Sequence, residues 1–162
     1  MKKITYFIFS FIILLILING CVGYKPIFSS TNLQFKIADY SIEGNKVLGK
    51  KIYYKLHSLS ESTKDNQNAR SVDFFINVSK DKNATVKDTT GKILEYKITL
   101  NTEIKVKDFI TDDQILNQTF TFSLTYNVQN QQSDTVKLEN RSIEAMIDKT
   151  YQELLIKLSQ NI

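Results

Sequence analysis

The feature that most constrains the fold of this chain is an alternation of apolar and polar side chains between Leu94 and Val106. The apolar side chains occupy even-numbered positions, which are Leu94, Tyr96, Ile98, Leu100, Ile104 and Val106. Successive side chains of a β-strand point to opposite faces of a sheet. The pattern therefore predicts one long strand with a buried face and a polar face.

Three further segments share this period of two. The first segment contains Leu33, Phe35 and Ile37. The second contains Val72, Phe74, Ile76 and Val78. The last contains Phe120, Phe122, Leu124, Tyr126 and Val128, all expected on the inner face. A polar stretch with turn-forming residues, 80–91, predicts the connection between the second and third strands, and Thr111-Asp112-Asp113 predicts the next turn.

Two segments change to the period of a helix. In residues 44–60 the apolar positions fall on one helical face, at Leu48, Ile52, Leu56 and Leu59. In residues 134–159 they recur at Ile143, Ile147, Tyr151, Leu154 and Leu158. Each segment is long enough to lay an apolar stripe against a sheet.

The resulting order, β-α-β-β-β-α, predicts an α+β fold with two helices packed on one face of a four-stranded mixed sheet. The first strand and helix require a crossover connection, whereas the last three strands can form an antiparallel meander. The opposite face of the sheet is rich in Thr, Ser, Asn, Lys and Glu. That face is either solvated or in contact with a partner that is equally polar.

The N-terminus has the order of a secretory signal peptide. Two lysines precede an apolar run, Ile4–Ile18, and Gly20 then stands before Cys21, the only cysteine. The run is too short and too abruptly ended for a spanning helix. With cysteine directly after a small residue, this segment resembles the lipobox of bacterial lipoproteins, although Asn19 departs from it. A secreted protein with a free thiol and an uncleaved anchor are the alternatives.

The lipobox resemblance implies that residues 1–20 are removed and that Cys21 carries an N-acyl and an S-diacylglycerol lipid. Residues 21–32 would then form the lipidated N-terminus and a linker, and residues 33–162 a single periplasmic domain. Two or three acyl chains hold a protein stably on a membrane without a spanning helix. The residue after the cysteine is Val22 rather than aspartate. By the same resemblance, this implies sorting to the outer membrane.

Charge and motifs exclude several classes of function. Lys2 and Lys3 account for two of the formal charges of +4, so the mature part carries +2 and argues weakly for nucleic acid. No serine or cysteine motif for nucleophilic catalysis is visible, and His57 is the only histidine. A zinc site or an EF-hand would need ligands or spacings that this chain lacks. We therefore expect no enzyme and no cofactor.

The chain resembles the lipopolysaccharide-assembly lipoproteins, the LptE-like family. Residues 23–28, Gly-Tyr-Lys-Pro-Ile-Phe, are similar to the family's Cys-Gly-aromatic-x-Pro-aliphatic-aromatic start, with Val22 inserted after the cysteine. The likeness continues through the strand at 94–100, through Phe122, Ser123 and Tyr126-Asn127, and through the final helix ending at 153–157. It rests on the order and spacing of these pieces together.

The resemblance implies an outer-membrane lipoprotein on the periplasmic side that sits within a large LptD-like β-barrel. Such a protein plugs the barrel, supports its assembly and helps to place lipopolysaccharide at the cell surface. Because lipopolysaccharide is polyanionic, basic side chains near the ends of the sheet are the candidate contacts. They are Arg70, Lys80, Lys82, Lys87 and Lys92. The alternative for this cluster is a solvated, lysine-rich loop.

Two other functions remain open from the sequence. One is an accessory lipoprotein of a lipid-transporting ABC system, which would have an inner-membrane pump as its partner. The other is a structural or adhesive surface lipoprotein, whose loss would leave surface lipopolysaccharide unchanged.

Overall fold

The structure is a computed structural model that describes residues 33–62 and 69–161. The chain divides into a unit of Met1–Ser30 and a unit of Thr31–Ile162. All described residues belong to the second unit. The signal peptide, Cys21 and the linker lie outside the described residues and stay predictions.

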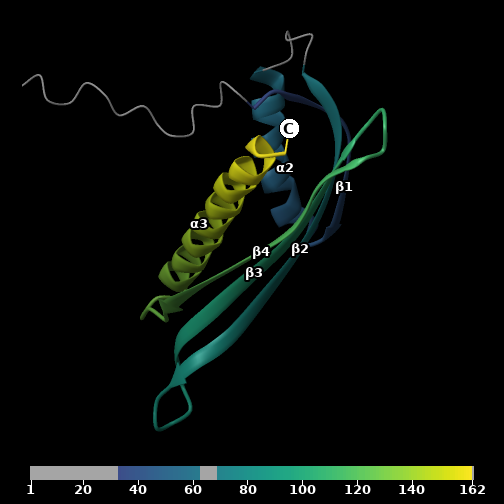
Figure 1. Ribbon diagram of the computed structural model, residues 1–162. Helices are drawn as coiled ribbons and strands as arrows, with labels where there is room; N and C mark the ends of the chain where they lie inside the picture. The colour runs from purple at the N-terminus through teal and green to yellow at the C-terminus, as the bar shows by residue number, and fades with distance from the viewer. Residues whose placement is uncertain (1–32, 63–68, 162) are drawn as a thin grey trace, which may run out of the picture. The chain divides into compact units, whose positions relative to one another are not determined.

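The second unit contains four strands and two helices in the described part of the chain (Figure 1). They are β1 (Phe35–Gly44), α2 (Lys46–Ser62), β2 (Arg70–Lys87), β3 (Ile93–Asp108), β4 (Gln114–Asn127) and α3 (Gln132–Ser159). The strands lie in sequence order in one sheet, with β1 parallel to β2 and the other pairs antiparallel. The α+β fold with a mixed sheet and the order β-α-β-β-β-α are therefore confirmed.

Both helices lie on the same side of the sheet (Figure 1). Helix α2 forms the crossover from β1 to β2 that a parallel pair requires. It begins at Lys46, and the side-chain oxygen of the preceding Asn45 accepts the Leu48 amide at 3.2 Å and so caps the first turn. The core lies between helices and sheet, where the even-numbered side chains of β2 and β3 meet Ile52, Leu56, Ile147 and Leu154.

The inward side chains follow the predicted alternation. The fully buried ones of the two central strands are Val72, Phe74, Ile76, Val78, Ile98, Leu100, Ile104 and Val106. Each contributes about 1.5–3 kcal/mol through burial. Thr102 completes this row and is also buried, although its hydroxyl has no hydrogen-bond partner in the part of the chain described. In contrast, Leu94 and Leu124, both predicted to point inward, are 41% and 40% exposed.

The connection predicted at residues 80–91 is wrong for most of its length. Strand β2 continues to Lys87, and its last nine residues are exposed. Their backbone pairs with β3, so the strand persists without an apolar side-chain pattern. The turn occupies only the residues around Asp88, whose carboxylate accepts the amides of Thr90 and Lys92 at 2.8 and 2.9 Å. Gly91 supplies a φ of +85° there.

No helix in the described ranges is both long enough and apolar enough to cross a bilayer.

Candidate functional site

The five basic residues predicted as one cluster occupy separate places in the fold. Arg70 is the first residue of β2 and Lys87 is its last. At about 3.4 Å per residue these two positions are about 55–60 Å apart. The prediction that Arg70 shares one end of the sheet with the lysines is therefore wrong, because β2 is a single continuous strand.

Lys80 and Lys82 are held by a carboxylate of α3. Their Nζ atoms lie 3.3 and 2.6 Å from the two oxygens of Glu139. The hydroxyl of Tyr126 donates to the same carboxylate at 2.9 Å. The Lys82 ammonium also lies 4.3 Å from the centroid of the Tyr96 ring, within cation–π range. We call Lys80, Lys82, Tyr126 and Glu139 the Glu139 cluster.

The electrostatics of the Glu139 cluster are those of a paired structural site. Partial burial acts to lower the pKa of Lys82, but its hydrogen bonds to Glu139 and Tyr126 outweigh burial and raise that pKa to about 12. Burial acts in the opposite direction on Glu139, whose pKa is nevertheless lowered by its bonds to Lys82, Tyr126 and Lys80. Both lysines therefore already have an anionic partner within the chain.

Lys87 and Lys92 flank the turn between β2 and β3, one on each side of it, and both are exposed. Neither side chain has an ion pair among the residues that the structure describes. The Asp88 carboxylate orders the turn between them by accepting two backbone amides and the Thr90 hydroxyl. Of the five predicted contacts, only these two are without an ion pair in the described part of the chain, because Arg70, Lys80 and Lys82 each pair with a carboxylate.

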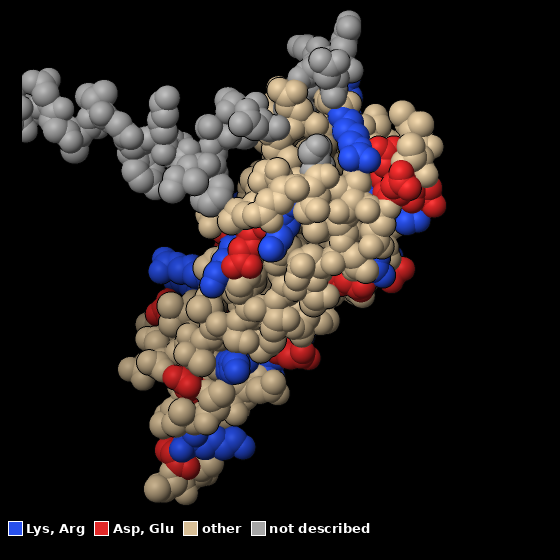
Figure 2. Space-filling model, viewed as in Figure 1, with Lys and Arg blue, Asp and Glu red and all other residues tan. Residues whose placement is uncertain are grey.

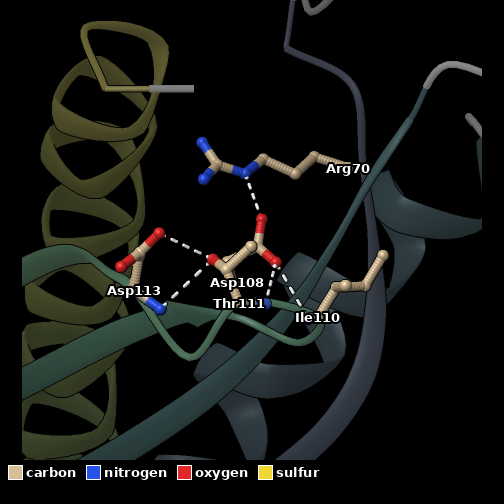
Figure 3. A network of polar contacts seen from close by, with 5 residues as sticks. All are labelled: Arg70, Asp108, Ile110, Thr111 and Asp113. Atoms are coloured by element: carbon tan, nitrogen blue, oxygen red, sulfur yellow. Dashed lines mark hydrogen bonds and ion pairs between the residues drawn. The ribbon is translucent and has the colours of Figure 1, made fainter.

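The opposite end of the sheet carries a second polar network (Figure 3). Arg70 Nε donates to one Asp108 oxygen at 2.5 Å, and the other oxygen accepts the amides of Ile110 and Thr111 at 2.8 and 3.0 Å. The Arg70 bond and these two amides lower the pKa of Asp108 to about 2. The network fixes the turn between β3 and β4, in which Asp112 has a φ of 59°.

The sheet face opposite the helices, which we call the open face, is polar. Cross-strand hydrogen bonds link the hydroxyls of Thr99 and Ser123 at 2.9 Å and join Thr121 to Asn101 at 2.8 Å. Beside them, Asp73 has one carboxylate oxygen that is shielded from solvent and has no hydrogen-bond partner in the described chain. Such groups are rare in native proteins and call for a partner or an ordered water.

Charges of both signs are mixed over the surface shown in Figure 2 rather than gathered into one field. This distribution agrees with the small formal charge, +2, of residues 21–162. Within residues 33–62 and 69–161, no three His, Cys, Asp or Glu side chains gather to hold a metal ion. The sequence missed Glu139 because no spacing rule joins it to lysines 57 and 59 residues earlier.

No protein-family model and no curated protein matches this chain. Solved structures do share its fold. Lipoprotein B of Nitrosomonas europaea, an uncharacterized protein, superimposes with a TM-score of 0.57 at 12% identity over 82% of this chain and 88% of its own. A minor lipoprotein of Acinetobacter baumannii gives 0.50 at 14% identity over 80% and 94%. At these identities the likeness concerns the fold alone, which this chain shares with bacterial lipoproteins.

Proposed function

We propose that the chain is a lipoprotein anchored through Cys21 to the outer membrane, on its periplasmic side. There it would plug a large β-barrel that delivers lipopolysaccharide to the cell surface and would support the assembly of that barrel. The proposal combines the lipobox and LptE-like resemblance of the sequence with three features of the fold.

The length of the sheet carries the proposal. The 16 residues of β3 extend over about 50 Å, compared with about 40–45 Å for a bilayer with its headgroups. The chain that follows the proposed lipid anchor enters the domain at β1, whose first residue, Phe35, pairs with Arg70. The turn with Lys87 and Lys92 lies at the other end of the same sheet. A domain held by its lipid at the inner leaflet could therefore present this turn at the outer leaflet.

The open face fits the lumen of a barrel, which is polar in membrane barrels. Its Thr, Ser and Asn side chains offer hydrogen bonds rather than an apolar patch. A lumen able to take such a domain belongs to barrels with many strands.

Lys87 and Lys92 would contact the phosphates of lipopolysaccharide as it leaves the barrel. Both are exposed, and their ammonium groups have no described ion pair to break. The Glu139 cluster would instead hold α3 against the two strands that carry the turn. Arg70, at the opposite end, would have no part in binding lipopolysaccharide.

The test is to place a photo-crosslinking amino acid at Thr99, on the open face, in the full chain in living cells. The proposal expects one abundant adduct, and mass spectrometry should identify in it a large outer-membrane barrel. The matched control is the same probe with Cys21→Ala, which removes the lipid and should abolish the adduct. An adduct with an inner-membrane transporter, or none with a barrel, would reject the proposal.

Depletion of the protein provides a second readout. Loss of the plug should lower the amount of folded barrel and of surface lipopolysaccharide together. Normal levels of both would favour a structural surface lipoprotein instead.

A further inference from the structure

The turn between β3 and β4 exposes two adjacent apolar side chains. Phe109 is 56% exposed and Ile110 is 83% exposed, the highest value among the exposed large hydrophobic side chains described. Burying such side chains would each gain about 1.5–3 kcal/mol, so their exposure in a free domain is costly. Adjacent bulky apolar residues at a protruding tip are typical of a segment that enters an apolar environment.

Hydrogen bonds hold the backbone of the tip, which lowers the entropic cost of binding through it. Asp108 accepts the amides of Ile110 and Thr111, and its own amide donates to the Asp113 carbonyl at 2.9 Å. The Phe109 amide donates to the Ser71 carbonyl at 3.0 Å, which ties the turn to the start of β2. The polar groups below the tip are thus satisfied, while the two apolar side chains are left uncovered.

The position of this turn indicates what covers it. Phe35, at the start of β1, pairs with Arg70, the neighbour of Ser71. The tip therefore lies at the end of the sheet at which β1 begins (Figure 1). Eleven residues, 22–32, lie between Cys21 and Leu33, the first residue described, and this segment can span at most about 40 Å. Lipid on Cys21 would therefore keep this end of the sheet within about 40 Å of the membrane surface.

We propose that Phe109 and Ile110 insert into the membrane surface that holds the lipid of Cys21. The inference rests on the lipid anchor of the proposed function and adds a second contact to it. A single tether limits the distance of a domain from the membrane but leaves its orientation free. The second contact sets the strands upright, with Lys87 and Lys92 at the end away from that surface. The acidic flank, Asp112 and Asp113, confines insertion to the two apolar side chains.

The sequence contains no tryptophan, so one introduced residue reports its own environment. The experiment uses the full lipidated chain with Ile110→Trp in vesicles of phosphatidylethanolamine and phosphatidylglycerol with brominated acyl chains. The matched control is Val86→Trp, at a position 44% exposed near the opposite end of the sheet. Side chains at the interface enter about 5–10 Å, within reach of acyl-chain bromines.

We expect the emission of Ile110→Trp to lose most of its intensity and to shift to shorter wavelength, whereas that of Val86→Trp is unchanged. If the emission of Ile110→Trp is the same in brominated as in ordinary vesicles, like that of Val86→Trp, the proposed membrane contact is wrong. Intact mass of the same preparations separates this failure from that of the proposed function. A chain without lipid contradicts the anchor, whereas a lipidated chain without quenching contradicts only the inserted tip.

A second measurement uses polarised infrared spectra of the lipidated protein in supported bilayers. The double variant Phe109→Ser with Ile110→Ser should lose the strand orientation of the parent chain while it keeps its lipid and its fold. Retained orientation would also overturn the proposal.

Discussion

Arg70 Nε donates to Asp108 Oδ2 at 2.5 Å, and this bond joins the first residue of β2 to the last residue of β3. The Asp108 side chain is only 10% exposed, and its second oxygen accepts two backbone amides. One carboxylate thus fastens the end of an antiparallel pair and shapes the turn that follows. Arg70, which the sequence suggested as a contact for an anionic ligand, already has its anion within the fold.

Asp108 should make the stability of the domain depend on pH. Its pKa in the folded state is about 2, compared with an ordinary value of 3.8. The Asp108 carboxylate binds a proton more readily in the unfolded state than in the folded state. The stability that ionised Asp108 contributes is therefore fully present above its ordinary pKa of 3.8 and is lost as the pH falls through about 2. Asp108→Asn should therefore be less stable than the parent at neutral pH, and the difference should shrink toward pH 2. Urea unfolding midpoints across this range measure it.

The control for this prediction is Asp81→Asn, which removes an exposed carboxylate of β2. It should keep the pH dependence of the parent, because Asp108 and its Arg70 partner are unchanged in this variant. A constant difference between Asp108→Asn and the parent down to pH 2 would contradict the role assigned to the Asp108 charge.

Lys82→Met should destabilise the domain, whereas Lys87→Met should not. Lys82 gives Glu139 its shorter ion pair, at 2.6 Å, and Glu139 is only 16% exposed. Because Lys82 itself is about one-third exposed, the expected cost is about 1 kcal/mol of unfolding free energy. The same change at Lys87, on the same strand, should stay within about 0.5 kcal/mol. Chemical denaturation of both variants makes the comparison, and equal costs would show that the Glu139 cluster contributes no stability.

The sequence predicted the elements and their faces because these depend on local periods. Alternation placed Val72, Phe74 and Ile98 correctly on the buried face, and the spacing of Ile143, Ile147 and Leu154 placed the buried stripe of α3. Alternation failed where the strand has no apolar face. Lys80–Lys87 forms a strand through backbone pairing with β3, and side-chain composition carries little record of such pairing.

The candidate site was less predictable than the fold because its contacts join distant parts of the chain. Lys80, Lys82, Lys87 and Lys92 look alike in sequence. Glu139, on a helix that packs beside only the first two, divides them into a paired set and an exposed set. The turn was predicted at Thr111-Asp112-Asp113, whereas in the structure it begins earlier and includes Phe109 and Ile110. The exposure of these two side chains depends on bonds of Asp108 and Ser71 that no sequence pattern records.

Two glycines with positive φ should differ in their tolerance of alanine. Gly44 has a φ of +66° and Gly91 a φ of +85°. An alanine at either position would have to adopt a left-handed backbone, which costs about 1 kcal/mol of unfolding free energy. A Cβ at Gly44 would also collide with the carbonyl oxygen of Val78, whereas a Cβ at Gly91 meets open space. Thermal unfolding should show Gly44→Ala to be the more destabilised by more than about 2 kcal/mol. Equal losses would mean that β1 can shift relative to β2.

Reversal of the two exposed lysines, Lys87→Glu with Lys92→Glu, should weaken binding of lipopolysaccharide to the full lipidated chain in detergent. Phosphate contacts by exposed ammonium groups are screened by salt, so the loss should be greatest at low ionic strength. There we expect a loss of affinity on the order of tenfold, equivalent to about 1.4 kcal/mol. Titration with fluorescent lipopolysaccharide measures it, and the unfolding midpoint should remain that of the parent because neither side chain has a described ion pair.

The matched control is Lys46→Glu with Lys50→Glu, which makes the same change in net charge on exposed positions of α2. If the turn beyond β2 is the contact, this control should bind lipopolysaccharide almost as the parent does. An equal loss of affinity in both double variants would instead mean that binding of lipopolysaccharide depends on net charge alone. Lys87 and Lys92 would then be a solvated turn, and the binding surface would have to be sought on the open face, where Lys97, Lys105 and Lys107 lie.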